Sequence, residues 1–586
     1  MGATTTASAA RGRYASAYEW LSSRLRPYIL FPFLGLLGLA MVYPVFMVVY
    51  GSFKGGPPGE DAPFTLDGYT RVWTQASTIK ALIVTFGLAI PRMATGVIFA
   101  VLATWIITRT NTPLRGVFEQ LMWLRVFLPV LPMLVAWIII GSGRMGLVNQ
   151  FLMNTFGFSS APLDIQSYWG IIFLSLMTSG SFFFMFMAPA FRNMDASLEE
   201  SSRVSGASNL TTLWRITVPI MMPAILGVTL LVFLFVLSSY ETELFLLGPK
   251  GVYVFTTYIW MMMGKIPTDY TAAMALSSAF MVFVAAVVLI QFKVLGGKQY
   301  VTVSGRGFGV RLIDLGAWKW VTFGLLASWT LVGLLFPMVV LIYGTFLNTY
   351  GLFDSGLTLE HWREALGHYA VIRSIKNTLW LGLMAATLGT VVYALMSYAS
   401  LRTRLKGRQG IEILSWVPRM APGIVMAVGI FWAIIGGIGA LKALYGTIFL
   451  MALIVVIEGT PQGMRMMNGG MVQLSAELEE AARVSGASWL GTMRKVVIPL
   501  LAPTLLNAWL LKFLSATRAL VIFLFIYKSQ SKVLSIDIFQ RMLGGEPQQA
   551  AVLGVILTAI SMVIAIFARF IASRQRRVME STVAIG

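Results

Sequence analysis

Two charged segments that recur at a fixed spacing carry the side chains of this sequence best suited to binding a partner. Residues 198–223 and 478–503 align without gaps at an offset of 280 residues and are identical at half of their positions. Both copies contain two consecutive glutamates, followed by an arginine and a glycine in the same register. A connector between apolar runs is free to vary, so a repeated polar segment indicates that something outside the chain binds both copies in the same way.

Capping residues predict two short helices in each copy. Ser197 and Glu200 fit an S-x-x-E capping box, which places a helix start at Ser197 with acidic residues near the positive end of its dipole. Gly206 and Gly486 are expected to end these helices, because glycine takes the left-handed conformation without a steric cost. Each copy is therefore expected to fold as helix, glycine turn and helix, lying across the membrane surface.

The second short helix and the long helix after it also have start signals. Ser208 and Ser488, two residues after the glycines, are expected to cap the second short helix. Two prolines in each copy suit the first turns of the membrane helix that follows, namely Pro219 and Pro223 in the first copy and Pro499 and Pro503 in the second.

This spacing resembles the EAA loop (E-A-A-x3-G-x9-I-x-L-P) of permease subunits in binding-protein-dependent ABC importers. The second copy matches through Glu480-Ala481-Ala482 and Gly486, and the first through Glu200-Ser201-Ser202 and Gly206, with serine replacing both alanines. In that family the loop is a coupling helix that sits in a cleft of the ATP-hydrolysing subunit. The resemblance implies eight ATPase-coupling residues: Glu199, Glu200, Arg203, Gly206, Glu479, Glu480, Arg483 and Gly486. The alternative is that both copies are ordinary amphipathic surface helices.

The composition is that of a polytopic membrane protein. Hydrophobic residues make up 57% of the 586 residues and charged residues 12%, so no soluble fold hides this much apolar surface. The net charge of +20 does not indicate nucleic-acid binding, because the lysines and arginines are scattered between apolar runs. The chain has no cysteine, which excludes disulfides and thiol chemistry.

About twelve apolar runs are long enough to cross a bilayer. They are expected near 28–50, 80–108, 117–140, 168–190, 217–239, 270–292, 318–346, 375–400, 411–435, 445–460, 498–520 and 549–571. The predicted fold is an all-α polytopic membrane protein with two parallel six-helix repeats, similar to a type I ABC importer permease. The expected domains are a cytoplasmic tail at 1–27, a first repeat at 28–292, a basic linker at 293–317, a second repeat at 318–571 and a cytoplasmic tail at 572–586.

The charge distribution predicts the orientation. Lysine and arginine are more frequent in alternate loops, which predicts that both termini and both repeated segments lie in the cytoplasm. The resemblance to importer permeases implies that the chain lies in the inner membrane of a prokaryote. An even number of spans in each half makes the repeats parallel rather than inverted. Further matches, such as Tyr43-Pro44 with Phe336-Pro337, occur at an offset of 293. The drop to 280 predicts a second half that is thirteen residues shorter around its third and fourth helices.

The sequence offers no catalytic group. A phosphate-binding loop needs G-x-x-x-x-G-K-S/T, and the Gly-Lys pairs ending at Lys265 and Lys298 lack the hydroxyl residue and the upstream glycine. The chain is therefore expected to be a transport subunit without a cofactor of its own, with ATP and magnesium on two copies of a partner ATPase subunit. No segment is large enough to bind the solute outside the membrane, so an extracytoplasmic binding protein is expected as well.

Polar residues at membrane depth are costly and usually face a cavity or a partner. Glu241, Glu243 and Arg518 lie one helix beyond the repeated segments and are candidates for a pathway or gate, with interhelical ion pairs as the alternative. Lys512 is expected to snorkel. Further candidates for buried polar pairs are Arg92, Glu119, Arg125, Glu412 and Arg419.

Two histidines share one external loop. His361 and His368 are seven residues apart and have no cysteine or ligand cluster beside them. They are expected to be ordinary surface residues rather than a metal site.

The expected mechanism is alternating access, driven by ATPase subunits that pull the two repeated segments together. The plan of a fused two-copy permease resembles the iron(III)-type importers, and residues 243–260, ELFLLGPKGVYVFTTYIW, are similar to theirs. The solute expected from this resemblance is iron(III), with a polyamine, thiamine or phosphonate as alternatives. A secondary transporter that works without nucleotide is the alternative from another class. An intramembrane enzyme would need a nucleophile with a base or a metal cluster, and the sequence offers neither.

Overall fold

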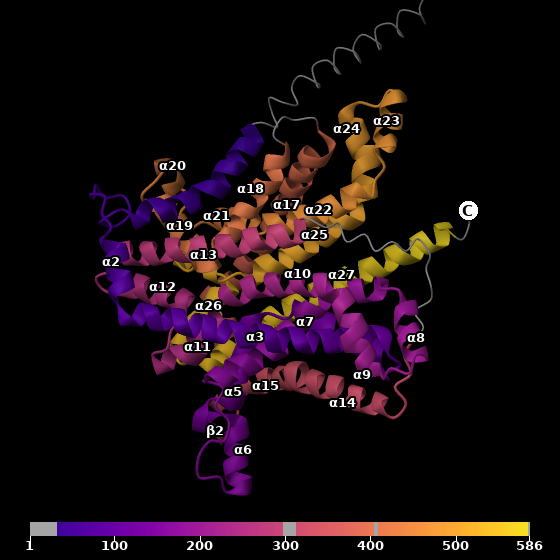
Figure 1. Ribbon diagram of the computed structural model, residues 1–586. Helices are drawn as coiled ribbons and strands as arrows, with labels where there is room; N and C mark the ends of the chain where they lie inside the picture. Colours follow the sequence, from indigo (N-terminus) through magenta and orange to yellow (C-terminus); the bar gives the residue numbers. More distant parts are fainter. Residues whose placement is uncertain (1–31, 297–311, 404–407, 584–586) are drawn as a thin grey trace, which may run out of the picture.

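The computed structural model describes residues 32–296, 312–403 and 408–583. These residues are mostly helical and include one two-stranded antiparallel sheet. The tails expected at 1–27 and 572–586 and the linker expected at 293–317 lie wholly or partly outside the described residues. Figure 1 shows most of the long helices running side by side, with α8 and α23 near the same end of the molecule.

The first half begins with a helix at Pro32–Ser52. It continues with α2 (Asp67–Thr74), α3 (Ala76–Arg109), α4 (Arg115–Phe127), α5 (Val130–Gly141), η1 (Gly143–Met145), α6 (Leu147–Phe156), α7 (Tyr168–Asn193), α8 (Ala196–Val204), α9 (Asn209–Thr212), the π turn η2 (Leu213–Thr217), α10 (Val218–Leu237), α11 (Glu241–Leu247), η3 (Gly248–Lys250), α12 (Phe255–Gly264) and α13 (Tyr270–Gly296).

The second half follows the same order. It contains α14 (Trp318–Thr330), the π turn η4 (Leu331–Leu335), α15 (Phe336–Gly344), β1 (Leu347–Thr349), β2 (Leu352–Leu357), α16 (Glu360–Gly367), α17 (Tyr369–Arg402), α18 (Arg408–Met420), α19 (Gly423–Ile435), α20 (Gly439–Lys442), α21 (Ile448–Glu458), α22 (Thr460–Val472), α23 (Ala476–Val484), α24 (Trp489–Thr492), the π turn η5 (Met493–Val497), α25 (Ile498–Arg518), η6 (Val521–Phe523), η7 (Ser529–Ser531), α26 (Leu534–Leu543) and α27 (Pro547–Val583).

The described residues contain nine helices that are long and apolar enough to cross a membrane, or twelve crossings if each bent pair counts as one. The bent pairs are α4 with α5 (101°), α18 with α19 (100°) and α21 with α22 (60°). The all-α polytopic fold with about twelve crossings is therefore confirmed. The bends were not predicted from the sequence.

Proline produces the two sharpest bends at equivalent places in the halves. Pro129 is the N-cap of α5 and Pro422 is the N-cap of α19, both with extended backbone. Proline lacks an N–H and disfavours the helical conformation in the residue before it, so the preceding helix ends there. Beyond the first bend, every residue of α5 after Val130 is buried.

The two halves repeat one another element by element. Helices α3 and α17 are both 34 residues long and begin 293 residues apart, whereas α8 and α23 are both 9 residues long and begin 280 apart. The change falls between the end of α5 at Gly141 and the start of α7 at Tyr168. The first half has α6 in this connection, where the second has only the short α20. The predicted length difference is thus an insertion between the third and fourth crossings.

The first crossing of each half packs against the other half. Gly429 of α19 lies so near the first helix that an added Cβ would be 2.5 Å from the Pro44 carbonyl oxygen. An added Cβ at Gly344 of α15 would likewise be 2.6 Å from the Ile139 side chain of α5. In Figure 1 the indigo first helix accordingly lies beside α18 and α19, and α15 lies beside α5. The exchange interlocks the halves into one body.

Candidate functional site

Each repeated segment folds as two short helices joined by a glycine. Gly206 has a φ of +85° after α8, and Gly486 has a φ of +82° after α23. Ser208 and Ser488 then cap α9 and α24 by accepting a hydrogen bond from the backbone N–H three residues on. A side chain makes a positive φ costly, so glycine sets the angle of both turns. The predicted arrangement of helix, glycine turn and helix is confirmed.

The capping box predicted at Ser197 is wrong. The N-cap of α8 is Asp195, whose carboxylate accepts a hydrogen bond from the Ser197 N–H at 2.9 Å. The helix therefore begins two residues before the predicted position. Hydrogen bonds from the Ser197 backbone and side chain hold the pKa of Asp195 below its ordinary value of 3.8. The equivalent cap of α23 is Ser475, which accepts from the Glu477 N–H.

Both repeated segments expose the same apolar side chains. The exposed fractions agree closely between copies for Val204 and Val484 (89% each), Leu210 and Leu490 (62% and 60%), and Leu198 and Leu478 (46% and 45%). Four of the predicted coupling residues accompany them: Glu480 and Arg483 are exposed, and Glu200 and Arg203 are partly exposed. An exposed apolar patch with charged residues around it is typical of a protein-binding surface. We call these two sets of residues the repeated surfaces.

The other two predicted carboxylates, Glu199 and Glu479, point into the protein. In the first half, Glu199 Oε2 pairs with Arg109 Nε at 3.1 Å, and both side chains are almost fully buried. Thr217 Oγ1 donates to the other carboxylate oxygen at 2.7 Å. Arg109 also donates to the Met194 carbonyl at 3.2 Å. The last residue of α3 thus fixes α8 to the membrane helices.

The second half has the same connection with looser geometry. Arg402 is the last residue of α17, and its Nε lies 3.6 Å from Glu479 Oε1. Arg402 also donates to the Met471 carbonyl at 2.8 Å. Arg483 approaches the same carboxylate at 3.9 Å. Sequence reasoning did not single out Arg109 and Arg402, although they stand at the offset of 293 and each ends a long apolar run.

Glu243, a candidate for the pathway, lies in an ion pair inside the first half. Its carboxylate pairs with Arg92 of α3, and Ser239 Oγ donates to it at 2.7 Å. Arg92 Nε donates in turn to Ser175 Oγ of α7 at 2.6 Å. The network joins three helices of one half, which is the interhelical alternative. Glu241, the other carboxylate, begins α11 and is half-buried.

Arg518, the third candidate, lies between the halves. It ends α25, and its Nη1 donates to the Val126 carbonyl of α4 at 3.0 Å. Arg125, the residue before this carbonyl, is 4% exposed. Lys512 does not snorkel as expected: it is buried, and its ammonium donates to the Val455 carbonyl of α21.

The remaining polar candidates are dispersed. Glu119 pairs with Arg192 of α7, whereas Glu412 is exposed on α18. Arg419 places its guanidinium 4.1 Å from the centre of the Phe235 ring, which belongs to the other half. His361 Nε2 lies 3.0 Å from the Leu347 carbonyl oxygen. In the described ranges, no group of three or more His, Cys, Asp or Glu is arranged to hold a metal ion.

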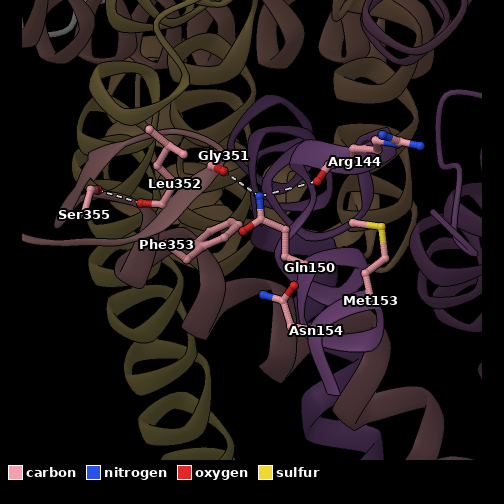
Figure 2. Close-up of a pocket in the computed structure, with 8 residues that line it drawn as sticks. All are labelled: Arg144, Gln150, Met153, Asn154, Gly351, Leu352, Phe353 and Ser355. Carbon is pink, nitrogen blue, oxygen red and sulfur yellow. Dashed lines mark hydrogen bonds between the residues drawn. The ribbon is translucent and has the colours of Figure 1, made fainter. Parts of the chain in front are cut away.

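A pocket of about 500 Å³ lies where the insertion of the first half meets the hairpin of the second. Figure 2 shows the Gln150 amide between the carbonyl groups of Arg144 and Gly351, to which it donates. Tyr350, beside the hairpin turn, donates to the Ile138 carbonyl of α5 at 3.1 Å. The hydrogen bonds of Gln150 to Gly351 and of Tyr350 to Ile138 both end on backbone carbonyls, and they connect the two halves beside the pocket.

Curated relatives of the chain are permease proteins. The FbpB 1 permease protein of Haemophilus influenzae is 27% identical over 86% of this chain and 78% of its own length. The ferric transport system permease protein FbpB of Actinobacillus pleuropneumoniae is 28% identical over 74% of this chain, which spans 63% of that relative. A crystal structure of a bacterial alginate ABC transporter with its periplasmic protein matches at a TM-score of 0.36 and 20% identity, over 44% of this chain and 97% of that one.

A family model matches the chain twice. The model is described as the binding-protein-dependent transport system inner membrane component, and it covers residues 94–297 and 397–577. The two matches contain the two repeated segments and fall in equivalent parts of the two halves. The chain therefore belongs to this family of inner-membrane components, as the fused two-copy permease of an ABC importer.

Proposed function

We propose that each repeated surface is the docking site of one ABC ATPase subunit, so that the permease works with two copies. The observation that carries this proposal is the matched exposure of Val204 and Val484 on capped, glycine-turned helices. Two surfaces of the same shape suit two identical partners, because each partner then makes the same contacts.

The buried ion pairs behind these surfaces supply the mechanical link. Arg109 connects α8 to the end of α3, and Arg402 connects α23 to the end of α17. A short helix held at one point by a buried ion pair moves together with the helix to which it is bound. Closure of the ATPase subunits would then turn α3 and α17, which are both 34 residues long, and open the pathway to each side of the membrane in turn.

The cargo we propose is iron(III), delivered by an extracytoplasmic binding protein. The Actinobacillus pleuropneumoniae relative is a ferric transport system permease protein, which supports iron, and the family description supports a binding protein. A polyamine is the second candidate, because the spermidine/putrescine transport permease PotC of Haemophilus influenzae is 25% identical over 41% of this chain. ATP and magnesium would lie on the ATPase subunits.

The docking test is co-purification of the chain with a candidate ABC ATPase subunit expressed in the same cells. The substitutions Val204→Glu and Val484→Glu place a charge in the centre of each repeated surface, and each is expected to lower the bound ATPase by about half, with the double variant losing nearly all of it. The control is Phe158→Glu, because Phe158 is 50% exposed in the connection between α6 and α7. Wild-type ATPase binding by the double variant would refute the docking site.

The cargo test is uptake by cells that carry the complete transporter. Radioactive iron(III) and labelled spermidine are supplied in turn, and accumulation that requires both the ATPase and the permease identifies the cargo. Uptake that persists without the ATPase would instead favour a secondary transporter.

A further inference from the structure

Two arginines lie near each other at the interface between the halves. Arg125 lies on α4 of the first half, just before the bend at Pro129, and Arg518 ends α25 of the second half. The Arg518 hydrogen bond to the Val126 carbonyl brings the two side chains to the same turn of α4, and they lie within electrostatic range of each other. Two positive charges are thus held together where the halves face each other.

Neither guanidinium is neutralised by the protein. Arg125 is 4% exposed, yet its Nε and one terminal nitrogen have no hydrogen-bond partner. Among the ion pairs of the described residues, none includes Arg125 or Arg518. Buried charged donors are costly when they are unpaired, and like charges side by side add to that cost. A bound anion would neutralise the two guanidinium groups and accept their free hydrogen bonds.

A third arginine lies at the equivalent bend of the second half. Arg419 precedes Pro422 on α18, stacks on Phe235 across the interface, and leaves one terminal nitrogen without a partner. Glu458 lies within electrostatic range of Arg419 and of Lys512, so this position is partly neutralised. The unbalanced charge is therefore greatest at Arg125 and Arg518.

We propose that Arg125 and Arg518 form an anion-binding site on the translocation route. The inference rests on the proposed function, because a route between the halves presupposes an importer permease. A planar guanidinium presents several N–H donors to an oxyanion, and two of them on different halves could hold one carboxylate or phosphate group between them.

The site narrows the class of cargo. A free polyamine or thiamine is a cation, and two unpaired arginines would repel it. A phosphonate is an anion, which the two arginines would attract. They would repel bare iron(III) but would attract an iron(III) chelate with a net negative charge. The expected cargo is therefore an oxyanion or an anionic metal chelate.

The absence of cysteine from the sequence permits a direct measurement of charge preference. Ser515 lies one turn before Arg518 on α25 and is partly exposed, so Ser515→Cys places the one thiol of the chain beside the site. The purified chain in nanodiscs is treated with a methanethiosulfonate that carries either a sulfonate or a trimethylammonium group. The quantity to compare is the rate of the anionic reagent divided by that of the cationic reagent. We expect this ratio to be at least about tenfold higher at the protein thiol than at a free thiol in solution, because a positive site concentrates anions.

Variants assign this preference to the two arginines. In the Ser515→Cys background, Arg125→Gln and Arg518→Gln should each reduce the preference several-fold, whereas Arg125→Lys and Arg518→Lys should retain most of it. Arg192→Gln is the control, since Arg192 pairs with Glu119 elsewhere. Citrate, phosphate and ferric citrate should slow the reaction in the parent, and spermidine should not.

Three outcomes would overturn the proposal. The first is an equal reaction with both reagents, or a faster one with the cationic reagent, in the parent. The second is an anionic preference that survives both glutamine substitutions. The third is a failure to react both at Ser515→Cys and at Val126→Cys, a second thiol placed beside the arginines, since water and anions would then not reach them. The measurement uses the chain alone, without ATPase or binding protein. A negative result would thus leave the docking test untouched, and failure of the docking test would leave the charge preference measurable.

Discussion

The backbone conformation of Gly206 and Gly486 fixes the angle between the helices of each repeated segment. A Cβ at either position would have nothing within 4 Å, so a side chain meets no clash and only the positive φ opposes it. We expect Gly206→Val and Gly486→Val to cost roughly 1–2 kcal/mol locally. Twelve packed crossings should still insert, and uptake per inserted molecule should fall further than expression.

Gly87→Val is the matched control for these substitutions. Gly87 lies within α3, has equally open space around its Cα and no positive φ. It should therefore insert and transport nearly as the parent does. Equal losses of uptake in all three variants would show that the turn conformation is not what matters.

The buried ion pairs predict unequal contributions from the two halves. Glu199→Ala removes a partner 3.1 Å from Arg109 and the acceptor of Thr217, leaving a buried cation, which should cost on the order of 3 kcal/mol. Glu479→Ala should cost less, because its pair with Arg402 is longer, at 3.6 Å, and more exposed. Thermal unfolding in nanodiscs and hydrogen exchange of α8 and α23 measure both effects. A larger loss from Glu479→Ala would contradict the geometry.

The two N-caps differ in their response to acid. The hydrogen bonds to Asp195 lower its pKa below 3.8, so the stabilisation of α8 is complete above that pH and is lost as the pH falls through the lower pKa of the folded state. Ser475 does not titrate in this range, so the cap of α23 should be insensitive. Hydrogen exchange, corrected for intrinsic rates, should accelerate on acidification in α8 but not in α23. The Asp195→Ser variant should abolish the difference.

Among the elements, α6 is the clearest asymmetry between the halves, and one side chain holds its loop together. Asn149 is fully buried, donates to the carbonyls of Gly143 and Leu163 at 2.6 Å each, and accepts from the Leu163 N–H at 2.9 Å. Asn149→Ala leaves these groups unpaired and should cost about 2–3 kcal/mol. We expect faster proteolysis between residues 143 and 165.

Asn154→Ala is the control for this loop. Asn154 lies five residues further along α6 and lines the pocket, and no described hydrogen bond depends on it. Its cleavage rate should match that of the parent. If both variants were cleaved equally fast, the Asn149 contacts would not be what orders the insertion.

The membrane crossings were predicted from the sequence more successfully than the bends within them. Apolar length alone located about twelve crossings, because a helix that spans lipid needs a continuous apolar run. The bends at Pro129 and Pro422 escaped notice, since only packing decides whether a proline kinks or ends a helix. The cap at Asp195 was missed for a similar reason, as two candidate acceptors stood two residues apart.

The candidate sites were predictable where they repeat and unpredictable where they depend on tertiary contacts. Gly206 and Gly486 were found because the same short motif occurs twice. Arg109 was not found, because its partner Glu199 lies ninety residues away and their contact exists only after α3 and α8 have packed. Glu243 was a candidate for the pathway, with an interhelical ion pair as the alternative, and the folded chain provides Arg92 as its partner within one half.

At the scale of the whole molecule, two parallel repeats have exchanged their first helices, and this has consequences for motion. Because the first helix packs on α19 and α15 packs on α5, neither half can turn as an isolated body. The Arg109–Glu199 pair connects α8 to α3. If ATPase subunits dock as proposed, we expect opening of the route between the halves to involve both repeated surfaces.

The orientation of the whole chain is the last prediction. Parallel repeats require Ser201 and Ala481, which are both exposed at equivalent positions, to lie on the same side of the membrane. The excess of lysine and arginine in alternate loops places that side in the cytoplasm. In this cysteine-free chain, Asp61→Cys and Ser355→Cys should react with an impermeant thiol reagent in intact cells, whereas Ser201→Cys and Ala481→Cys should react only after the cells are opened.

Each possible pattern of labelling has a distinct meaning. Reaction of Ser201→Cys and Ala481→Cys in intact cells, with protection of the other two, would reverse the orientation but keep the repeats parallel. Reaction of only one of Ser201→Cys and Ala481→Cys in intact cells would show that the repeats are inverted. Only one repeated surface would then face the cytoplasm, where an ATPase could bind it. Two ATPase subunits can dock only if both repeated surfaces face the cytoplasm, the compartment that holds ATP. Labelling of the four single-cysteine variants measures whether they do.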